Sequence, residues 1–153
     1  MPVQAVVGEV KRKWKVDVND SQVYRARRKA RSIIFGQYKE QYHQLWDYTA
    51  TIRQTNQESC VLMKVDRLTT EMPPTFERMY LSLAAMRDGF KIGCRPIIGL
   101  DGCHLKGPFK GQLLSAVSRD ANDNMYPITI AIVEAETKDS WTWFLETLVS
   151  DLG

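Results

Sequence analysis

An aspartate at the end of an apolar run is the first residue whose type and position could support chemistry. Asp101 directly follows Pro96-Ile97-Ile98-Gly99-Leu100, a run typical of a strand in the middle of a sheet. A carboxylate that emerges from such a run needs a partner, an ion or water. The functional interpretation is that this partner is an ion. The structural alternative is that Asp101 accepts hydrogen bonds from the neighbouring backbone.

Other carboxylates could cluster with Asp101 where the strands end. The candidates are Glu134, Glu136 and Asp139. In an antiparallel meander the first and third strands run in the same direction, so their ends lie about 10 Å apart with one strand between them. This distance is too long for Glu134 or Glu136 to share an ion with Asp101.

The cysteines and histidines give weaker alternatives. Cys60, Cys94, Cys103, His43 and His104 show no paired C-x-x-C spacing, which argues against a zinc finger and a disulfide framework. Cys103 and His104 are adjacent and would point to opposite faces of a strand, so a structural role is favoured over metal ligation. No spacing selects a nucleophilic Cys–His pair.

Two basic clusters in the first third of the chain could bind a polyanion. They consist of Lys11, Arg12, Lys13 and Lys15, followed by Arg25, Arg27, Arg28 and Arg31. Residues 1–47 carry ten Lys/Arg against five Asp/Glu, whereas residues 48–153 carry eleven against thirteen. Such clusters attract nucleic acid through counterion release. The alternative is a solvated helical face.

Composition excludes several classes of protein. The 153 residues are 44% hydrophobic, which is enough for a packed core. The apolar runs are far shorter than the roughly 18–20 residues that span a bilayer, so we expect no membrane partner. The first residues carry no basic segment that would indicate a secretory signal. We therefore expect a chain whose thiols stay reduced.

Apolar spacing predicts helices in the first part of the chain. They are expected near residues 4–14, from 20 or 21 to Gly36, and from 38 to 56. A short strand is expected over 60–65. A further helix is expected from Thr75 to Gly89, with Phe76, Met79 and Tyr80 on its apolar face. Residues 1–92 are thus expected to form a helical, basic lead-in region.

The second part of the chain shows strand patterns followed by a helical one. Three antiparallel strands are expected near 96–105, 112–120 and 125–136. A helix capped by Asp139 is expected over 139–151. Its covering face should consist of Trp141, Phe144, Leu145 and Leu148. The fold class is therefore α+β, with an N-terminal helical segment before three strands and a covering helix.

A resemblance to a known family begins at residues 93–107, GCRPIIGLDGCHLKG. This run resembles the opening of the catalytic domain of plant Mutator-like (MULE, MuDR-type) transposases. The likeness continues through 111–122, 125–128 and 133–136 to 139–145. The stretch from Val23 to Tyr48 also looks like the segment that precedes this domain in the family.

The resemblance implies a DDE-type enzyme of DNA transposition with an RNase H-like fold. Residues 93–153 would be the N-terminal part of that domain, which begins with three antiparallel strands and a helix. In the family, two aspartates and a glutamate bind divalent metal ions, Mg²⁺ or Mn²⁺, which activate water and then a DNA 3′-hydroxyl. Asp101 looks like the first aspartate. The second aspartate and the glutamate are expected beyond Gly153.

Two functions follow as hypotheses. The first is a fragment of a transposable-element transposase that acts on DNA in the nucleus and is inactive alone. The second is a non-catalytic remnant that binds DNA through the basic helices or binds another chain through an exposed sheet edge, self-association included.

Overall fold

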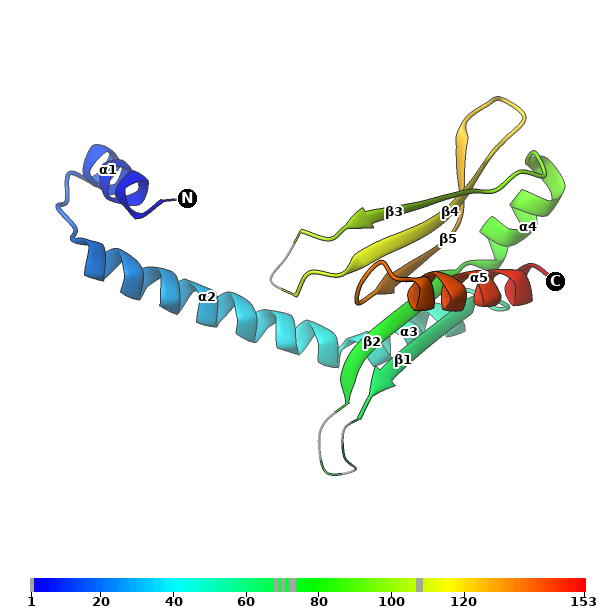
Figure 1. Ribbon diagram of the computed structural model, residues 1–153, viewed down its shortest axis with the longest axis horizontal. Helices are drawn as coiled ribbons and strands as arrows, with labels where there is room; N and C mark the ends of the chain where they lie inside the picture. Colours follow the sequence, from blue (N-terminus) through cyan, green and yellow to red (C-terminus); the bar gives the residue numbers. More distant parts are fainter. Residues whose placement is uncertain (1, 68, 70, 72–73, 107–108) are drawn as a thin grey trace. The chain divides into compact units, whose positions relative to one another are not determined.

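The computed structural model describes residues 2–67, 69, 71, 74–106 and 109–153. The chain divides into two compact units, Met1–Leu45 and Trp46–Gly153, and each is described by itself. Figure 1 shows helices in the first unit and a sheet with its helices in the second. Gly107, the last residue of the run 93–107, lies outside the described residues.

The first unit contains α1 (Val3–Trp14) and α2 (Asp20–His43). Asn19 caps α2 because its side chain accepts the Gln22 N–H at 2.9 Å, while the Gln22 side chain accepts the Asn19 N–H at 2.8 Å. This reciprocal pair satisfies two backbone donors at the start of the helix. Val23 is 4% exposed and gives this unit a small core.

The expected helix end at Gly36 is wrong. The helix continues through Gly36 to His43, and α3 (Leu45–Thr55) follows. A glycine ends a helix when it adopts left-handed backbone angles. Gly36 is not among the residues with positive φ, so it is accommodated inside the helix.

The helix expected from Thr75 to Gly89 is also wrong over its first half. Residues Cys60–Asp66 and Thr75–Ser82 form an antiparallel pair, β1 and β2, and α4 covers only Ala84–Gly93. Tyr80 is fully buried in this pair and lies opposite Leu62. Pairing within the sheet thus overrides the apolar spacing that favoured a helix. Residues 1–92 are therefore helical only in part.

The three strands expected in the second part of the chain are confirmed. They are β3 (Gly99–His104), β4 (Gln112–Arg119) and β5 (Met125–Val133). Within the described residues the sheet has five antiparallel strands in the order β1-β2-β5-β4-β3. The strand expected over 60–65 is confirmed as β1, and β2 is the strand that the sequence did not predict. In this strand order β3 lies at an edge, and in the described part of the chain its one partner strand is β4.

The helix α5 (Lys138–Leu152) covers one face of the sheet, as Figure 1 shows. Its cap is Thr137, which forms a reciprocal pair with Ser140, and not Asp139 as expected. Phe144 and Leu148 are buried in the core that this face forms, together with Tyr80, Leu114, Ala116, Ile128, Ala131 and Val133. Leu145, expected on the covering face, is 36% exposed. Burial of a large apolar side chain such as Phe144 or Leu148 in this core stabilises the fold by about 1.5–3 kcal/mol.

Candidate functional site

Asp101 lies on the edge strand β3 and is exposed. Its Oδ1 atom accepts the backbone N–H of Gly102 at 2.9 Å, and its backbone oxygen accepts the Ser115 hydroxyl at 3.4 Å. Side chains alternate between the two faces of a strand. Gly102 is paired with the buried Leu114, so Asp101 points away from the face that α5 covers.

Glu136 lies much closer to β3 than the sequence predicted. A Cβ atom at Gly102 would lie 3.2–3.4 Å from the atoms of the Glu136 carboxyl group. The expected separation of about 10 Å assumed a straight third strand, whereas β5 ends at Val133 and the following turn brings the carboxylate to the edge strand. The Nε1–H group of Trp141 donates to this carboxylate at 3.3 Å.

This approach does not give Asp101 a carboxylate partner. Glu136 meets Gly102 on the side where a Gly102 side chain would project, and the neighbouring Asp101 projects from the opposite face. The two carboxylates therefore lie on different faces of β3.

Glu134 and Asp139 are hydrogen-bonded to the side chain of Arg78, a residue that the sequence analysis did not single out. The guanidinium of Arg78 donates to Glu134 at 2.6 and 2.9 Å and to Asp139, although the Arg78 side chain is only 4% exposed. These hydrogen bonds lower the pKa of both carboxyl groups. The signal that could have found Arg78 was a basic residue in an apolar strand, but the segment was assigned to a helix.

The described residues do not fit a two-metal centre. Among them, no three His, Cys, Asp or Glu side chains gather closely enough to hold a metal ion. Asp101 is a single carboxylate, and Glu134 and Asp139 are held by Arg78. Two-metal catalysis needs several carboxylates around ions roughly 4 Å apart.

The three cysteines form no disulfide among the described residues, and His104 has a hydrogen-bond partner in the sheet. Cys60, Cys94 and Cys103 are all free. His104 binds the amide of Gln112 through Nδ1 at 2.7 Å, which gives this histidine a partner within the sheet.

The two basic clusters differ in their local partners. In the first, Lys11 forms an ion pair with Asp17 at 2.7 Å and Arg12 with Glu9 at 2.6 Å. The ammonium group of Lys13 lies 4.9 Å from the centre of the Trp14 ring. Lys15 occupies the left-handed backbone region at the end of α1. Exposed pairs of this kind contribute little stability, but they do neutralise part of the local charge.

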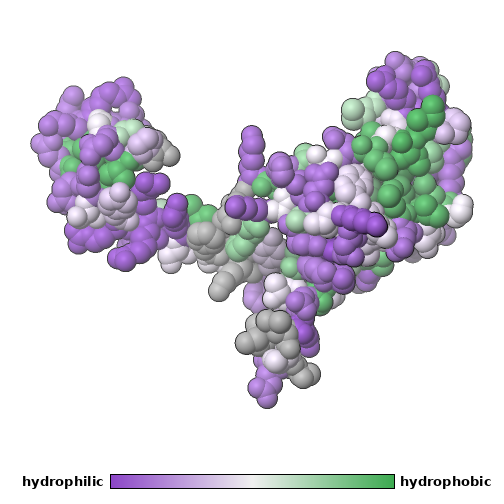
Figure 2. Space-filling model, viewed as in Figure 1, coloured by the Kyte–Doolittle hydropathy of each residue, from purple (hydrophilic) through white to green (hydrophobic). Residues whose placement is uncertain are grey.

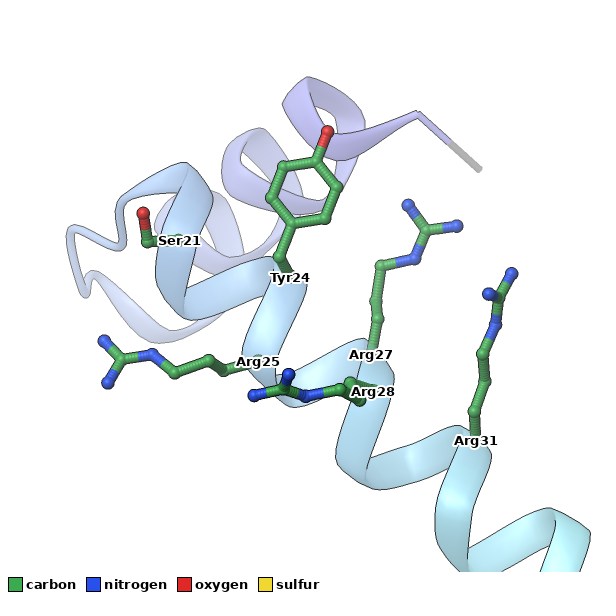
Figure 3. Close-up of a pocket in the computed structure, with 6 residues that line it drawn as sticks. All are labelled: Ser21, Tyr24, Arg25, Arg27, Arg28 and Arg31. Carbon is green, nitrogen blue, oxygen red and sulfur yellow. The ribbon is translucent and has the colours of Figure 1, made fainter.

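The second cluster lies on α2 and forms its cationic surface. A cavity of about 620 Å³ is lined by Ser21, Tyr24, Arg25, Arg27, Arg28 and Arg31, and Figure 3 shows these six side chains. Within the described part of the chain, none of these four arginines forms an ion pair or a side-chain hydrogen bond. Tyr24, which is 62% exposed, was missed as a site residue. Its helical spacing to Arg27 and Arg31 was a signal that could have identified it.

Across the described residues, no helix is both long and apolar enough to cross a membrane. Figure 2 shows hydrophobic side chains gathered on the visible face over the region of α4. Ile92, at the end of that helix, is 88% exposed.

Comparison with known proteins finds one matching family model. Residues 97–152 match the model of the MULE transposase domain, and this range contains Asp101, β4, β5 and α5. The match confirms the resemblance to Mutator-like transposases. No curated protein and no solved structure matches the chain.

Proposed function

Because residues 97–152 match the MULE transposase domain, we propose that this chain is a fragment of a Mutator-like DNA transposase, related to the MuDR type of plants, that does not cut DNA by itself. The three antiparallel strands followed by α5 agree with the beginning of an RNase H-like domain. DNA is its partner and the nucleus its place of action, as the family implies.

The isolation of Asp101 carries this proposal. Strand cleavage in the family depends on divalent metal ions, Mg²⁺ or Mn²⁺, held by several carboxylates. Here Asp101 accepts a backbone hydrogen bond, Glu136 approaches the other face of β3, and Glu134 is bonded to Arg78. Asp101 alone would hold a hydrated Mg²⁺ only weakly.

A nicking assay tests the absence of cleavage. Purified chain is incubated with supercoiled DNA and Mg²⁺ or Mn²⁺, beside Asp101→Asn. We expect no nicking in either sample. Metal-dependent nicking that Asp101→Asn abolishes would show that the chain cuts DNA alone.

The cationic surface of α2 favours DNA binding as the activity that remains. Arg25, Arg27, Arg28 and Arg31 lack acidic partners among the described residues, so their charge can neutralise phosphates and release counterions. The cluster formed by Lys11, Arg12, Lys13 and Lys15 adds charge, but two of its cations already have carboxylate partners. We therefore assign the larger part of the DNA contact to α2.

The salt dependence of binding tests this assignment. For the native chain, the logarithm of the binding constant should fall by about 0.9 for each neutralised phosphate per tenfold rise in salt. Replacing the four arginines of α2 by alanine should flatten this slope. Unchanged binding after the replacement would reject α2 as the DNA contact.

The edge strand β3 is the second proposed interaction surface. Among the residues that the structure describes, β3 pairs on one side only, and an unpaired edge offers backbone donors and acceptors to another strand. Leu100 on this strand is 45% exposed, which adds apolar surface to the edge. We assign self-association to this edge.

A further inference from the structure

The cavity on α2 combines an exposed aromatic ring with unpaired cations. Its lining consists of Tyr24, Ser21 and four arginines. Tyr24 and Arg27 are three residues apart, and Tyr24 and Arg31 seven, so the three side chains lie on one face of the helix. In Figure 3 the ring of Tyr24 projects to the same side as the guanidinium groups of Arg27 and Arg31.

Among the described residues of the first unit, none fills the space beside Tyr24 and the arginines. The Tyr24 side chain has no hydrogen bond within the described residues and is 62% exposed. Asp20, at the start of the same helix, accepts hydrogen bonds from Gln4 at 3.1 and 3.2 Å and is not part of the lining. The ring and the cations are thus available to a ligand from solution.

An aromatic ring amid arginines matches one form of nucleic acid better than another. In a duplex the base faces are stacked on one another, so a protein ring has no base face to cover. An unpaired strand offers both base faces and phosphates, and proteins bind it by combining aromatic stacking with a cationic groove. A surface that contacted only duplex phosphates would need the arginines and not the ring.

We propose that the α2 cavity binds single-stranded DNA, with one base stacked on Tyr24 and the adjoining phosphates held by Arg27 and Arg31. The inference rests on the proposed DNA binding and adds the form of DNA recognised. Arg25 and Arg28, which Figure 3 shows projecting to another side of the helix, would extend the contact along the strand.

Binding of three fluorescent probes tests the inference. The probes are a 15-nucleotide dT strand, an rU strand of equal length and a 15-base-pair duplex, each measured by anisotropy with the full chain. Tyr24→Ala should weaken dT binding about 5- to 160-fold, the range of one lost stacking contact. Duplex binding should change less than about twofold. Tyr24→Phe keeps the ring and should retain dT binding.

A matched control uses another exposed tyrosine. Tyr48 lies on α3, is 54% exposed and is outside the cavity, so Tyr48→Ala should leave dT binding unchanged. Circular dichroism of each variant verifies that the helices are retained.

The outcomes distinguish single-strand binding at Tyr24 from the more general proposal that α2 binds DNA. If replacing the four arginines weakens binding but Tyr24→Ala has no effect, or weakens dT and duplex equally, the cavity binds backbone only and the inference is overturned. Stronger binding to rU than to dT would overturn the assignment to DNA. If the arginine replacement changes nothing with any probe, the proposed DNA binding itself fails.

Discussion

The side chain of Arg78 is buried on β2 and bonded to carboxylates from two other parts of the sheet unit. Its guanidinium bonds Glu134 after β5 and Asp139 in the first turn of α5, and it lies 5.7 Å from the centre of the Trp143 ring. These contacts join a strand, a turn and the covering helix. Because a buried cation with three such partners is costly to replace, substitutions of Arg78 should destabilise the whole unit.

We expect Arg78→Met to lower the free energy of unfolding by about 1–3 kcal/mol, through lost charge-assisted hydrogen bonds. Urea denaturation followed by circular dichroism measures this change. Arg119→Met serves as a control because Arg119 is 59% exposed and pairs with the exposed Asp123, so its effect should stay within about 0.5 kcal/mol. Equal stability of Arg78→Met and the native chain would contradict the role of Arg78.

The same cation should make stability depend on acid. The pKa values of Glu134 and Asp139 are lowered by hydrogen bonds from Arg78. Such groups stabilise the fold above their unfolded pKa of about 4, and this stabilisation is lost as pH falls through the lower folded value. Between about pH 5 and pH 2, stability should therefore fall less in Arg78→Met. The difference should be small because the side chains of Glu134 and Asp139 are 44% and 80% exposed.

Single residues could be predicted from the sequence where their chemistry depends on local pattern. Asp101 follows an apolar run, and the structure places it in an exposed position on a strand. Its structural alternative, a backbone hydrogen bond, is present. Glu136 could not be placed from the sequence, because its position depends on how the turn after Val133 crosses the sheet.

At the scale of elements, the docking of α4 depends on a glycine. A Cβ atom at Gly89 would lie 2.1 Å from the hydroxyl oxygen of Tyr126 on β5, which donates to the Ala85 backbone oxygen at 3.3 Å. Gly89→Ala should therefore destabilise the chain by about 1–3 kcal/mol, because the ring must shift or the helix must move.

Two further variants make this a test of contact and not of helix propensity. Gly93 is in the same helix, and a Cβ atom there would meet no other atom within 4 Å, so Gly93→Ala should be neutral or slightly stabilising. Tyr126→Phe removes the obstructing hydroxyl and should recover part of the loss in Gly89→Ala. Thermal unfolding is measured for the native chain, Gly89→Ala, Gly93→Ala and Gly89→Ala combined with Tyr126→Phe. If the combined variant is no more stable than Gly89→Ala, the contact is contradicted.

Elements with strong local signals were predictable, and those defined by distant partners were not. Apolar and polar residues alternate along β4 and β5 or these strands end in clear turns, and the apolar residues of α5 recur at helical spacing. The residues of β2 fit either spacing, since Phe76, Met79 and Tyr80 could form a helical stripe. Their pairing with β1 and β5 decides the outcome, and no local pattern reveals that pairing.

At the scale of the whole molecule, the unpaired edge of β3 should govern association. We expect the native chain to form larger species as its concentration rises. Leu100→Lys places a charge on the edge and should suppress them. Val149→Lys, on the exposed side of α5, is the control and should not. Sedimentation at several concentrations measures this, and identical profiles for all three chains would contradict edge pairing.

The pairing of β2 with β5 also has a consequence for how the chain folds. Tyr80 lies opposite Ala131, about fifty positions later, although β1 and β2 are close neighbours in sequence. Closing such a loop costs on the order of 3–4 kcal/mol of chain entropy before any burial repays it. During synthesis the β1–β2 hairpin therefore keeps its apolar face exposed to water until β5 has been made. The slow step of folding should be the pairing of β2 with β5. Until that step, the exposed β1–β2 hairpin is the segment that a chaperone would protect.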